Sequence, residues 1–371
     1  MLALRDEMKV SVKTITYNHE KYIAQAIESV MMQHVTFDYE LVIGEDCSTD
    51  NTRNIVLAYR DRYPDKIRVL LADTNLGALN NSERTEAACR GEYVAYLEGD
   101  DFWTSSDKLQ KQVDFLDNHP ECSICFHNVN VLSDSQGQII RQYCGTDQKE
   151  FTALEDILVA NYIPTCSVMF RNRFIQKLPD WFAKLPMTDW PTHVMNAQHG
   201  NIGYINEVMA TYRVHDGGVW SRMGYAERIT ANLRFYKEIN RYLSYRYDAL
   251  ISAQASAWWK RLSVELIEQG YQLGLQNPDI NHVMTIFESW PDAIPYTREW
   301  RTDVLGHIYE RLLFAFHAAR RNAECRYALA RLIQYNPAGL KNRGVWSIGS
   351  SILLGDRITR NARRAVRNII P

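Results

Sequence analysis

The chain has 371 residues, which is too long for one small domain and fits about two. Hydrophobic residues make up 46% of it and aromatic residues 11%, enough for a sizeable core, which argues against long disordered stretches. The formal net charge of −2 argues against nucleic acid as the main partner, and seven cysteines without regular spacing are typical of free thiols in a reducing compartment.

The amino-terminal residues lack the apolar core of an export signal, because Arg5, Asp6, Glu7 and Lys9 are charged. No stretch of the sequence reaches the ~18 apolar residues that a membrane span needs. We therefore expect a cytoplasmic protein, either soluble or associated with the inner face of the cell membrane.

Strand-like and helix-like patterns alternate in the first half of the chain. The expected strands are residues 10–16, 39–43, 67–71 and 93–97, and the expected helices are residues 21–32, the segment after Asp50, and the segment from Gly77 to Cys89. This rhythm predicts an α/β fold with a doubly wound, mostly parallel sheet.

Three carboxylates follow the fourth expected strand directly: Glu98, Asp100 and Asp101, separated only by Gly99. Neighbouring acids repel one another unless a cation neutralises them, and carboxylate oxygens suit Mn²⁺ or Mg²⁺ ions that also bind substrate phosphates. The segment therefore predicts a divalent ion that carries a phosphate ester. A solvated turn with a helix cap is the alternative.

Polar clusters follow three of the expected strands, at residues 17–20, 45–50 and 98–101. Parallel strands bring their carboxyl ends to one edge of the sheet, so these clusters are expected to converge. The sequence has neither the Gly-x-Gly-x-x-Gly of dinucleotide folds nor the Gly-x-x-x-x-Gly-Lys-Ser/Thr of P-loop enzymes. A nucleotide would therefore be held by side chains and a metal.

Four motifs in this order resemble those of the family 2 glycosyltransferases with the GT-A fold. They are Thr-Tyr-Asn-His-Glu (16–20), Glu-Asp-Cys-Ser-Thr-Asp (45–50), Asn-Leu-Gly (75–77) and Leu-Glu-Gly-Asp-Asp-Phe-Trp (97–103). The resemblance covers residues 10–220. It implies a Rossmann-like GT-A domain that transfers a sugar from a nucleotide donor, usually a UDP-sugar, with inversion at the anomeric carbon.

The resemblance also implies roles for single residues. Tyr17 and Glu20 would line the base and ribose pocket, and Asp46 would accept a hydrogen bond from the base. Asp100 is implied as the direct ligand of Mn²⁺ or Mg²⁺, with Asp101 beside it. Glu98 stands where the family more commonly has Asp, which implies a ribose contact or a ligand through water. The remaining nucleotide-binding candidates in these motifs are Thr16, Asn18, Ser48, Asn75 and Gly99.

Asp189 precedes an apolar helix, with Pro191 in the first turn. Residue statistics alone favour a helix cap at this position. The resemblance instead implies that Asp189 is the general base, which takes the proton from the acceptor hydroxyl as that hydroxyl attacks the anomeric carbon. Trp190 would offer a flat face to the acceptor sugar.

A strand expected over residues 208–214 leads into a segment with one histidine and two glycines. A lone histidine near a strand end is commonly a surface residue, but the resemblance implies that His215 completes the metal site or binds the diphosphate. Arg213 would bind the phosphates or pair with an acid. Trp220 belongs to a loop that would close over the donor.

Beyond residue 224 the pattern changes to helices without catalytic motifs. We expect a glycosyltransferase domain over residues 1–224, a helical accessory region over 225–345 and a basic amphipathic helix over 346–371. In the last segment apolar residues recur four apart while five arginines crowd the other positions, which is typical of a helix on anionic lipid. A docked terminal helix with a solvated face is the alternative.

Together these features predict a metal-dependent hexosyl- or N-acetylhexosaminyltransferase that acts on a saccharide or lipid-linked saccharide in surface polysaccharide synthesis. Two other classes stay open. One is a nucleotidyltransferase or sugar hydrolase on the same fold, and the other is a non-catalytic scaffold that binds nucleotide sugars. The presence of a metal motif together with a base argues against the scaffold.

Overall fold

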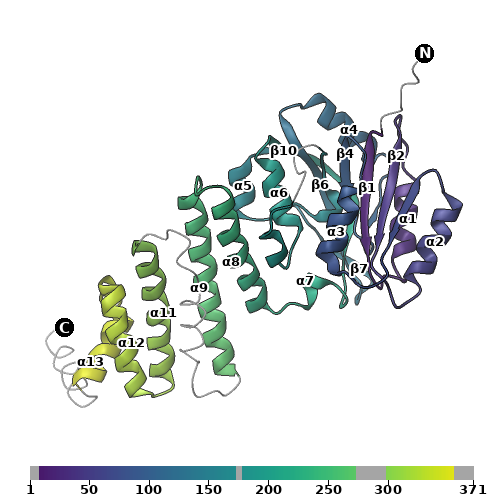
Figure 1. Ribbon diagram of the computed structural model, residues 1–371. Helices are drawn as coiled ribbons and strands as arrows, with labels where there is room; N and C mark the ends of the chain where they lie inside the picture. Colours follow the sequence, from purple (N-terminus) through teal and green to yellow (C-terminus); the bar gives the residue numbers. More distant parts are fainter. Residues whose placement is uncertain (1–7, 173–177, 273–297, 355–371) are drawn as a thin grey trace. The chain divides into compact units, whose positions relative to one another are not determined.

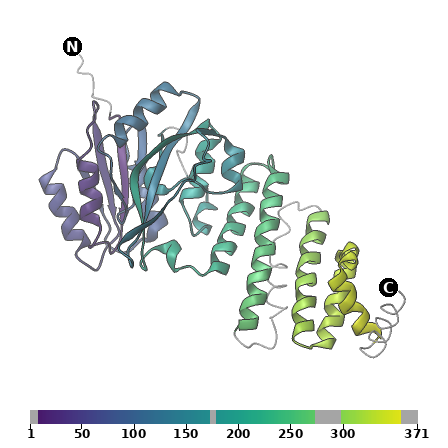
Figure 2. The same ribbon diagram turned by 180° about the vertical axis from the view of Figure 1, so that it is seen from behind.

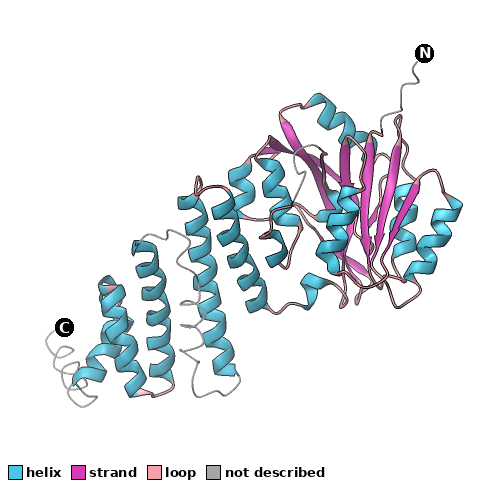
Figure 3. Cartoon of the chain, viewed as in Figure 1, coloured by secondary structure: helices cyan, strands magenta, loops and turns pink. Residues whose placement is uncertain are grey.

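The computed structural model describes residues 8–172, 178–272 and 298–354 (Figure 1). The chain divides into two compact units, Met1–Arg222 and Met223–Pro371. All the strands of the described residues lie in the first unit, and the described part of the second unit is helical (Figure 3).

The first unit begins with four parallel strands of one sheet, in the spatial order β3-β2-β1-β4. These strands are β1 (Val10–Thr16), β2 (Tyr39–Glu45), β3 (Ile67–Leu71) and β4 (Tyr93–Tyr96). The helices that connect them are α1 (Ile23–Met31), α2 (Thr52–Arg62) and α3 (Gly77–Ala87). The predicted alternation of strands and helices is confirmed.

Beyond β4 the sheet becomes mixed. Its further strands are β5 (Phe102–Trp103), β6 (Cys122–Ser133), β7 (Gln138–Gln142), β8 (Phe151–Thr152), β9 (Met169–Arg171) and β10 (Asn201–Val214). The helices of this half are α4 (Lys108–Asn118), α5 (Leu154–Val159), α6 (Asp189–Ala197) and α7 (Val219–Arg222). β9 lies antiparallel between β4 and β6, and β10 runs parallel to β6 and antiparallel to β5. The end of β10 therefore lies beside the turn between β4 and β5.

Helices cover both faces of the parallel strands (Figures 1 and 2). On one face, α1 and α4 contribute Ile27 and Leu109 to the apolar core. On the other face, α3 approaches Gly44 of β2 so closely that a Cβ there would lie 2.0 Å from Thr85 Oγ1. Since β1, β2 and β4 are buried on both faces, the loops at the carboxyl ends of the strands are the part of the sheet that is free to bind a ligand.

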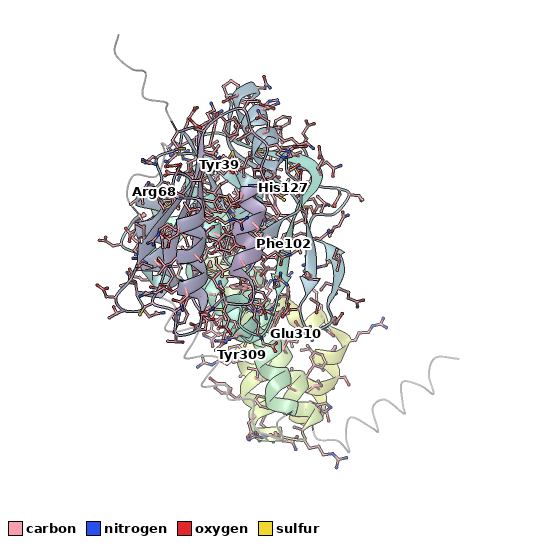
Figure 4. The ribbon with its side chains drawn as sticks, turned by 90° about the vertical axis from the view of Figure 1, so that its right-hand side faces the viewer. Tyr39, Arg68, Phe102, His127, Tyr309 and Glu310 are labelled. Carbon is pink, nitrogen blue, oxygen red and sulfur yellow. The ribbon has the colours of Figure 1, made fainter. Side chains whose placement is uncertain are left out.

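Lys108 is fully buried at the start of α4. Its Nζ lies 3.8 Å from the centroid of the Trp103 ring and has no hydrogen-bond partner among the described residues. Burial lowers the pKa of Lys108 to about 7. Burial, together with the nearby Lys108, lowers the pKa of His127 of β6 (labelled in Figure 4) to about 3. A cation in this place is therefore expected to destabilise the folded state.

We expect Lys108→Met to make the protein more stable at pH 7 and below, where folded and unfolded chains both carry the charge and only the folded chain buries it. As the pH rises from about 7 to 10, the folded chain has lost the proton while the unfolded chain keeps it, so the wild type gains stability relative to the variant. Each pKa unit corresponds to about 1.4 kcal/mol. Urea unfolding of both proteins at several pH values measures the difference. A variant less stable than the wild type at pH 7 would contradict this account.

The second unit contains α8 (Tyr225–Tyr242), α9 (Asp248–Gln272), α11 (Arg298–Ala318), α12 (Asn322–Tyr335) and α13 (Arg343–Leu354). Apolar side chains of these helices are buried, as Leu233 and Tyr236 in α8 and Ile308 and Leu312 in α11 illustrate. The basic helix predicted over residues 346–371 is described only as far as the end of α13, and residues 355–371 lie outside the described residues. Of the helices that the structure describes, none combines the length and apolar character that crossing a bilayer requires.

Candidate active site

The loops that follow β1 and β2 are joined by hydrogen bonds, as their position at one edge of a parallel sheet predicts. The backbone N–H of Asn18 donates to Ser48 Oγ over 3.0 Å, and the N–H of Thr49 donates to Asn18 Oδ1 over 2.8 Å. The N–H of Glu20 donates to Asp50 Oδ2 over 3.1 Å. Asn18 has a φ of 56°, a left-handed conformation that Asn tolerates better than most residues. These hydrogen bonds join the clusters at residues 17–20 and 45–50 into one structure, which we call the corner.

Asp46 connects this corner to the third motif. Its Oδ1 accepts a hydrogen bond from the N–H of Leu76 over 2.8 Å, and its Oδ2 accepts one from the N–H of Gly77 over 3.0 Å. Asn75 Nδ2 donates to the backbone oxygen of Asp46 over 3.3 Å. The carboxylate predicted to meet the base thus caps the start of α3, and its side chain is buried.

Other predicted nucleotide-binding residues lie on the open side of the corner. Tyr17 is 40% exposed, and Glu20 is exposed while its Oε2 accepts a hydrogen bond from the N–H of Asn51 over 3.0 Å. Trp220 of α7 is also exposed, at 36%. Tyr17 and Trp220 therefore present aromatic surface to solvent, where a ligand can reach it.

Gly99 allows the acidic motif to pack against the end of β1. A Cβ at this position would lie 2.8 Å from His19 Nδ1 and 2.9 Å from Thr16 Oγ1. The N–H of Gly99 donates to the backbone oxygen of Ile15 over 3.1 Å. The missing side chain therefore lets the turn that carries the acids lie directly on the first cluster.

Asp100 lies between two imidazoles. His215 Nε2 is 2.9 Å from Asp100 Oδ2, and His19 Nε2 is 3.8 Å from the same oxygen. Burial by itself would raise the pKa of Asp100, but the hydrogen bond from His215 and the nearby His19 hold it below its ordinary value. Asp100 is therefore an anionic carboxylate at the point where β1, the acidic turn and the end of β10 meet.

Asp101 has a different partner from Asp100, which departs from the expectation that it lies beside Asp100 in the metal site. Its side chain is 2% exposed, and its Oδ1 accepts a hydrogen bond from the N–H of Arg213 over 2.7 Å. Burial and the neighbouring Asp100 raise the pKa of Asp101 well above its ordinary value. Asp101 therefore joins the motif to β10, while Asp100 contacts the two histidines.

The guanidinium of Arg213 is held by several partners. Its Nε donates to the backbone oxygen of Asp100 over 2.9 Å, its Nη2 donates to Gln25 Oε1 over 2.8 Å, and its Nη1 lies 3.2 Å from Asp134 Oδ1. Phe102 (Figure 4) and Tyr22 flank it, with ring centroids 5.4 and 4.7 Å away. Of the two roles predicted for Arg213, the structure shows the pairing with an acid, Asp134. These contacts leave the guanidinium little freedom to reach a phosphate.

Asp189 is the first residue of α6, and Asn161 Nδ2 donates to its Oδ2 over 2.8 Å. The next residue departs from the prediction of an exposed sugar platform. Trp190 is 5% exposed, and its Nε1 donates to the backbone oxygen of Ile157 over 2.7 Å. Its ring is buried because α6 packs on α5, a contact that the local sequence does not reveal.

Glu98 shows that Asp189 and the acidic motif belong to one electrostatic site. Burial raises the pKa of Glu98 to about 7, the nearby Lys13 opposes this rise, and Asp100 and Asp189 add to it. Each of these two carboxylates acts on Glu98 in this way only if it lies within range of the Glu98 carboxyl group. The predicted base therefore lies near the predicted metal motif.

Asp100 and His215 fit a divalent ion that would take its remaining ligands from a substrate. Among the described residues, no group of three or more His, Cys, Asp and Glu side chains is arranged to hold a metal ion. Asp100 nevertheless offers an anionic oxygen, and His215 Nε2 would become a second ligand if an ion replaced the proton that it now shares with Asp100. Mg²⁺ and similar ions commonly take one or two protein ligands and complete their shell with water and substrate phosphates.

Sequence reasoning missed two residues of this site. His19 belongs to the first motif but received no role, although its position directly before Glu20 was a usable signal. Asn161 lies in a loop after α5, 28 positions before Asp189. No local pattern connects it with the base.

Comparison with known proteins shows that part of the first unit is similar to a described family. Residues 11–176 match the family model described as Glycosyl transferase family 2. An uncharacterised protein of Mycobacterium tuberculosis is 38% identical over 211 residues, which cover 57% of this chain and 60% of that protein. The chain therefore spans about 60% of the length of these first relatives.

Two further relatives carry more informative names. TuaG of Bacillus subtilis, whose name marks a role in teichuronic acid biosynthesis as provisional, is 29% identical over 235 residues, which cover 62% of this chain and 88% of TuaG. The structure of residues 1–349 of Staphylococcus aureus TarS in complex with UDP-GlcNAc aligns with a TM-score of 0.50 and 17% identity. That alignment covers 94% of this chain and 92% of the TarS chain, and at this identity it shows the fold alone.

Proposed function

We propose that this chain, which has the GT-A fold, is a member of glycosyl transferase family 2 and acts as an inverting glycosyltransferase that uses a nucleotide sugar. The acceptor would be a saccharide or a lipid-linked saccharide. The observation that carries the proposal is the arrangement at the strand ends. Asp100 lies against two imidazoles, and Asp189 is close enough to influence the same acidic motif.

The chemistry divides between two carboxylates. Asp189 takes the proton of the acceptor hydroxyl while the hydroxyl oxygen bonds to the anomeric carbon, and the bond from that carbon to the diphosphate breaks. When bound at Asp100 and His215, Mn²⁺ or Mg²⁺ supplies the positive charge that stabilises the leaving diphosphate. One base is enough, and no covalent enzyme intermediate is needed, so the anomeric configuration inverts.

We propose UDP as the nucleotide and surface polysaccharide as the product. The TarS structure holds UDP-GlcNAc, and the name of TuaG refers to teichuronic acid. This supports a hexosyl- or N-acetylhexosaminyltransferase without fixing the sugar. A lipid-linked acceptor would bring the protein to the cytoplasmic face of the membrane, where the arginine-rich segment over residues 355–371 would meet anionic lipid.

Titration of the purified protein with UDP by calorimetry, in the presence of Mn²⁺ and again after chelation, tests the donor site. We expect binding that depends on the metal, because Asp100 and His215 would hold an ion whose positive charge attracts the diphosphate. Absence of binding by UDP, GDP, CMP and TDP under both conditions would contradict the proposal. Metal-dependent binding without release of UDP from any UDP-sugar would favour the non-catalytic scaffold.

A further inference from the structure

We propose that Asn161 and the indole of Trp190 are positioning residues that hold Asp189 in the geometry of a general base. This inference rests on the proposed function, because it assigns a task to residues around the predicted base. Neither residue needs to touch the substrate. Each acts by fixing the place and the direction of the Asp189 carboxylate.

The Asn161 amide has one orientation that satisfies both of its contacts. Its Oδ1 accepts a hydrogen bond from the N–H of Ile163 over 3.3 Å, which leaves Nδ2 to donate to Asp189 Oδ2 over 2.8 Å. Asn161 is partly buried. The bond engages one carboxylate oxygen of Asp189 and leaves the other oxygen to accept a proton from a substrate.

Trp190 fixes the backbone that carries the base. Its indole N–H donates over 2.7 Å to the backbone oxygen of Ile157, which lies in the last turn of α5. Carbonyls in the last turn of a helix have no partner within that helix, so the indole meets an unfilled acceptor. The start of α6 is thereby joined to α5, and Asn161, two residues beyond the end of α5, adds a second hydrogen bond between the two regions.

The hydrogen bonds made by Asn161 and Trp190, which we call the clamp, have a catalytic consequence because proton transfer depends on geometry. The base must lie within hydrogen-bond distance of the acceptor hydroxyl, and a displacement of about 1 Å can reduce the rate ~100-fold. A carboxylate at a helix start without side-chain partners would rotate about its χ angles. The two contacts remove that freedom before substrate binds.

The experiment measures UDP release from UDP-GlcNAc in the presence of Mn²⁺, with water in place of the acceptor. Asn161→Leu keeps the side-chain size and removes the donor. We expect its kcat to fall ~10- to 100-fold while the KM for UDP-GlcNAc changes less than about twofold. Trp190→Phe, which keeps a ring and removes the indole N–H, should lower kcat by a smaller factor. Asn161→His keeps an N–H donor two bonds beyond Cβ and should recover part of the rate.

Asn172→Leu is the matched control. Its Nδ2 donates to the backbone oxygens of Gly91 and Cys89 over 2.9 and 3.3 Å, at the amino end of β4. We expect this variant to have a lower Tm and the kcat of the wild type. An Asn161→Leu protein with the kcat of the wild type, or one that loses kcat only as much as Asn172→Leu does, would overturn the clamp alone. A wild type that neither binds UDP with Mn²⁺ nor releases it would overturn the proposed function together with the clamp.

Discussion

Asp189→Asn is expected to reduce the kcat for sugar transfer by ~10²- to 10⁴-fold and to leave the affinity for UDP unchanged. A general base contributes a factor of that size, and the amide cannot accept the proton of the attacking hydroxyl. Asn keeps the size of the side chain and an oxygen that can accept the hydrogen bond from Asn161. The start of α6 should therefore keep its structure.

Two measurements separate this result from misfolding. Release of UDP from a UDP-sugar with Mn²⁺ present gives kcat, and calorimetry gives the affinity for UDP. Asp61→Asn makes the same chemical change at an exposed residue that, within the described part of the chain, forms an ion pair with its neighbour Arg60, so it should behave like the wild type. Full transfer activity in Asp189→Asn would show that the base assignment is wrong.

Asp100→Asn is expected to remove the part of UDP binding that depends on the metal. Asp100 is the carboxylate that meets both His215 and His19, so its loss removes the negative charge that attracts the ion. Changes to residues that merely support a metal ligand already cost 10–100-fold in affinity or activity. We therefore expect the Kd for UDP with Mn²⁺ to rise at least ~100-fold, to the value measured after chelation.

Asp107→Asn is the control for this second result, because it makes the same change seven residues further on at a largely exposed side chain. The two variants are compared by calorimetry with and without Mn²⁺, and by thermal unfolding to confirm that both are folded. If Asp100→Asn bound UDP with the same metal dependence as the wild type, the ion would have to bind elsewhere.

The sequence was enough to predict that the polar clusters meet at one edge of the sheet, because this follows from the alternation of strands and helices. Strands that alternate with single helices run parallel, so their carboxyl ends meet at one edge. The hydrogen bonds from Asn18 to Ser48 and from Glu20 to Asp50 agree with that expectation. The same reasoning placed the acidic turn beside the first cluster, where Gly99 packs on Thr16.

The direction of each side chain was not predictable in this way. Asp100 and Asp101 are identical neighbours in the sequence, yet one faces two imidazoles and the other is buried against β10. Their difference depends on the antiparallel pairing of β5 with β10, which brings together residues more than a hundred positions apart. A window of local sequence contains no trace of such a partner.

The sequence by itself determined the order of strands and helices, the edge of the sheet at which the site lies and the residue types that it contains. Only the tertiary structure decided which of these side chains are exposed and which are held by other residues. It buried Trp190 against α5, paired Arg213 with Asp134, and brought His19 to Asp100 and Asn161 to Asp189. The physical reason is that periodicity reports which face of an element is apolar, whereas a hydrogen bond between distant residues depends on how whole elements pack.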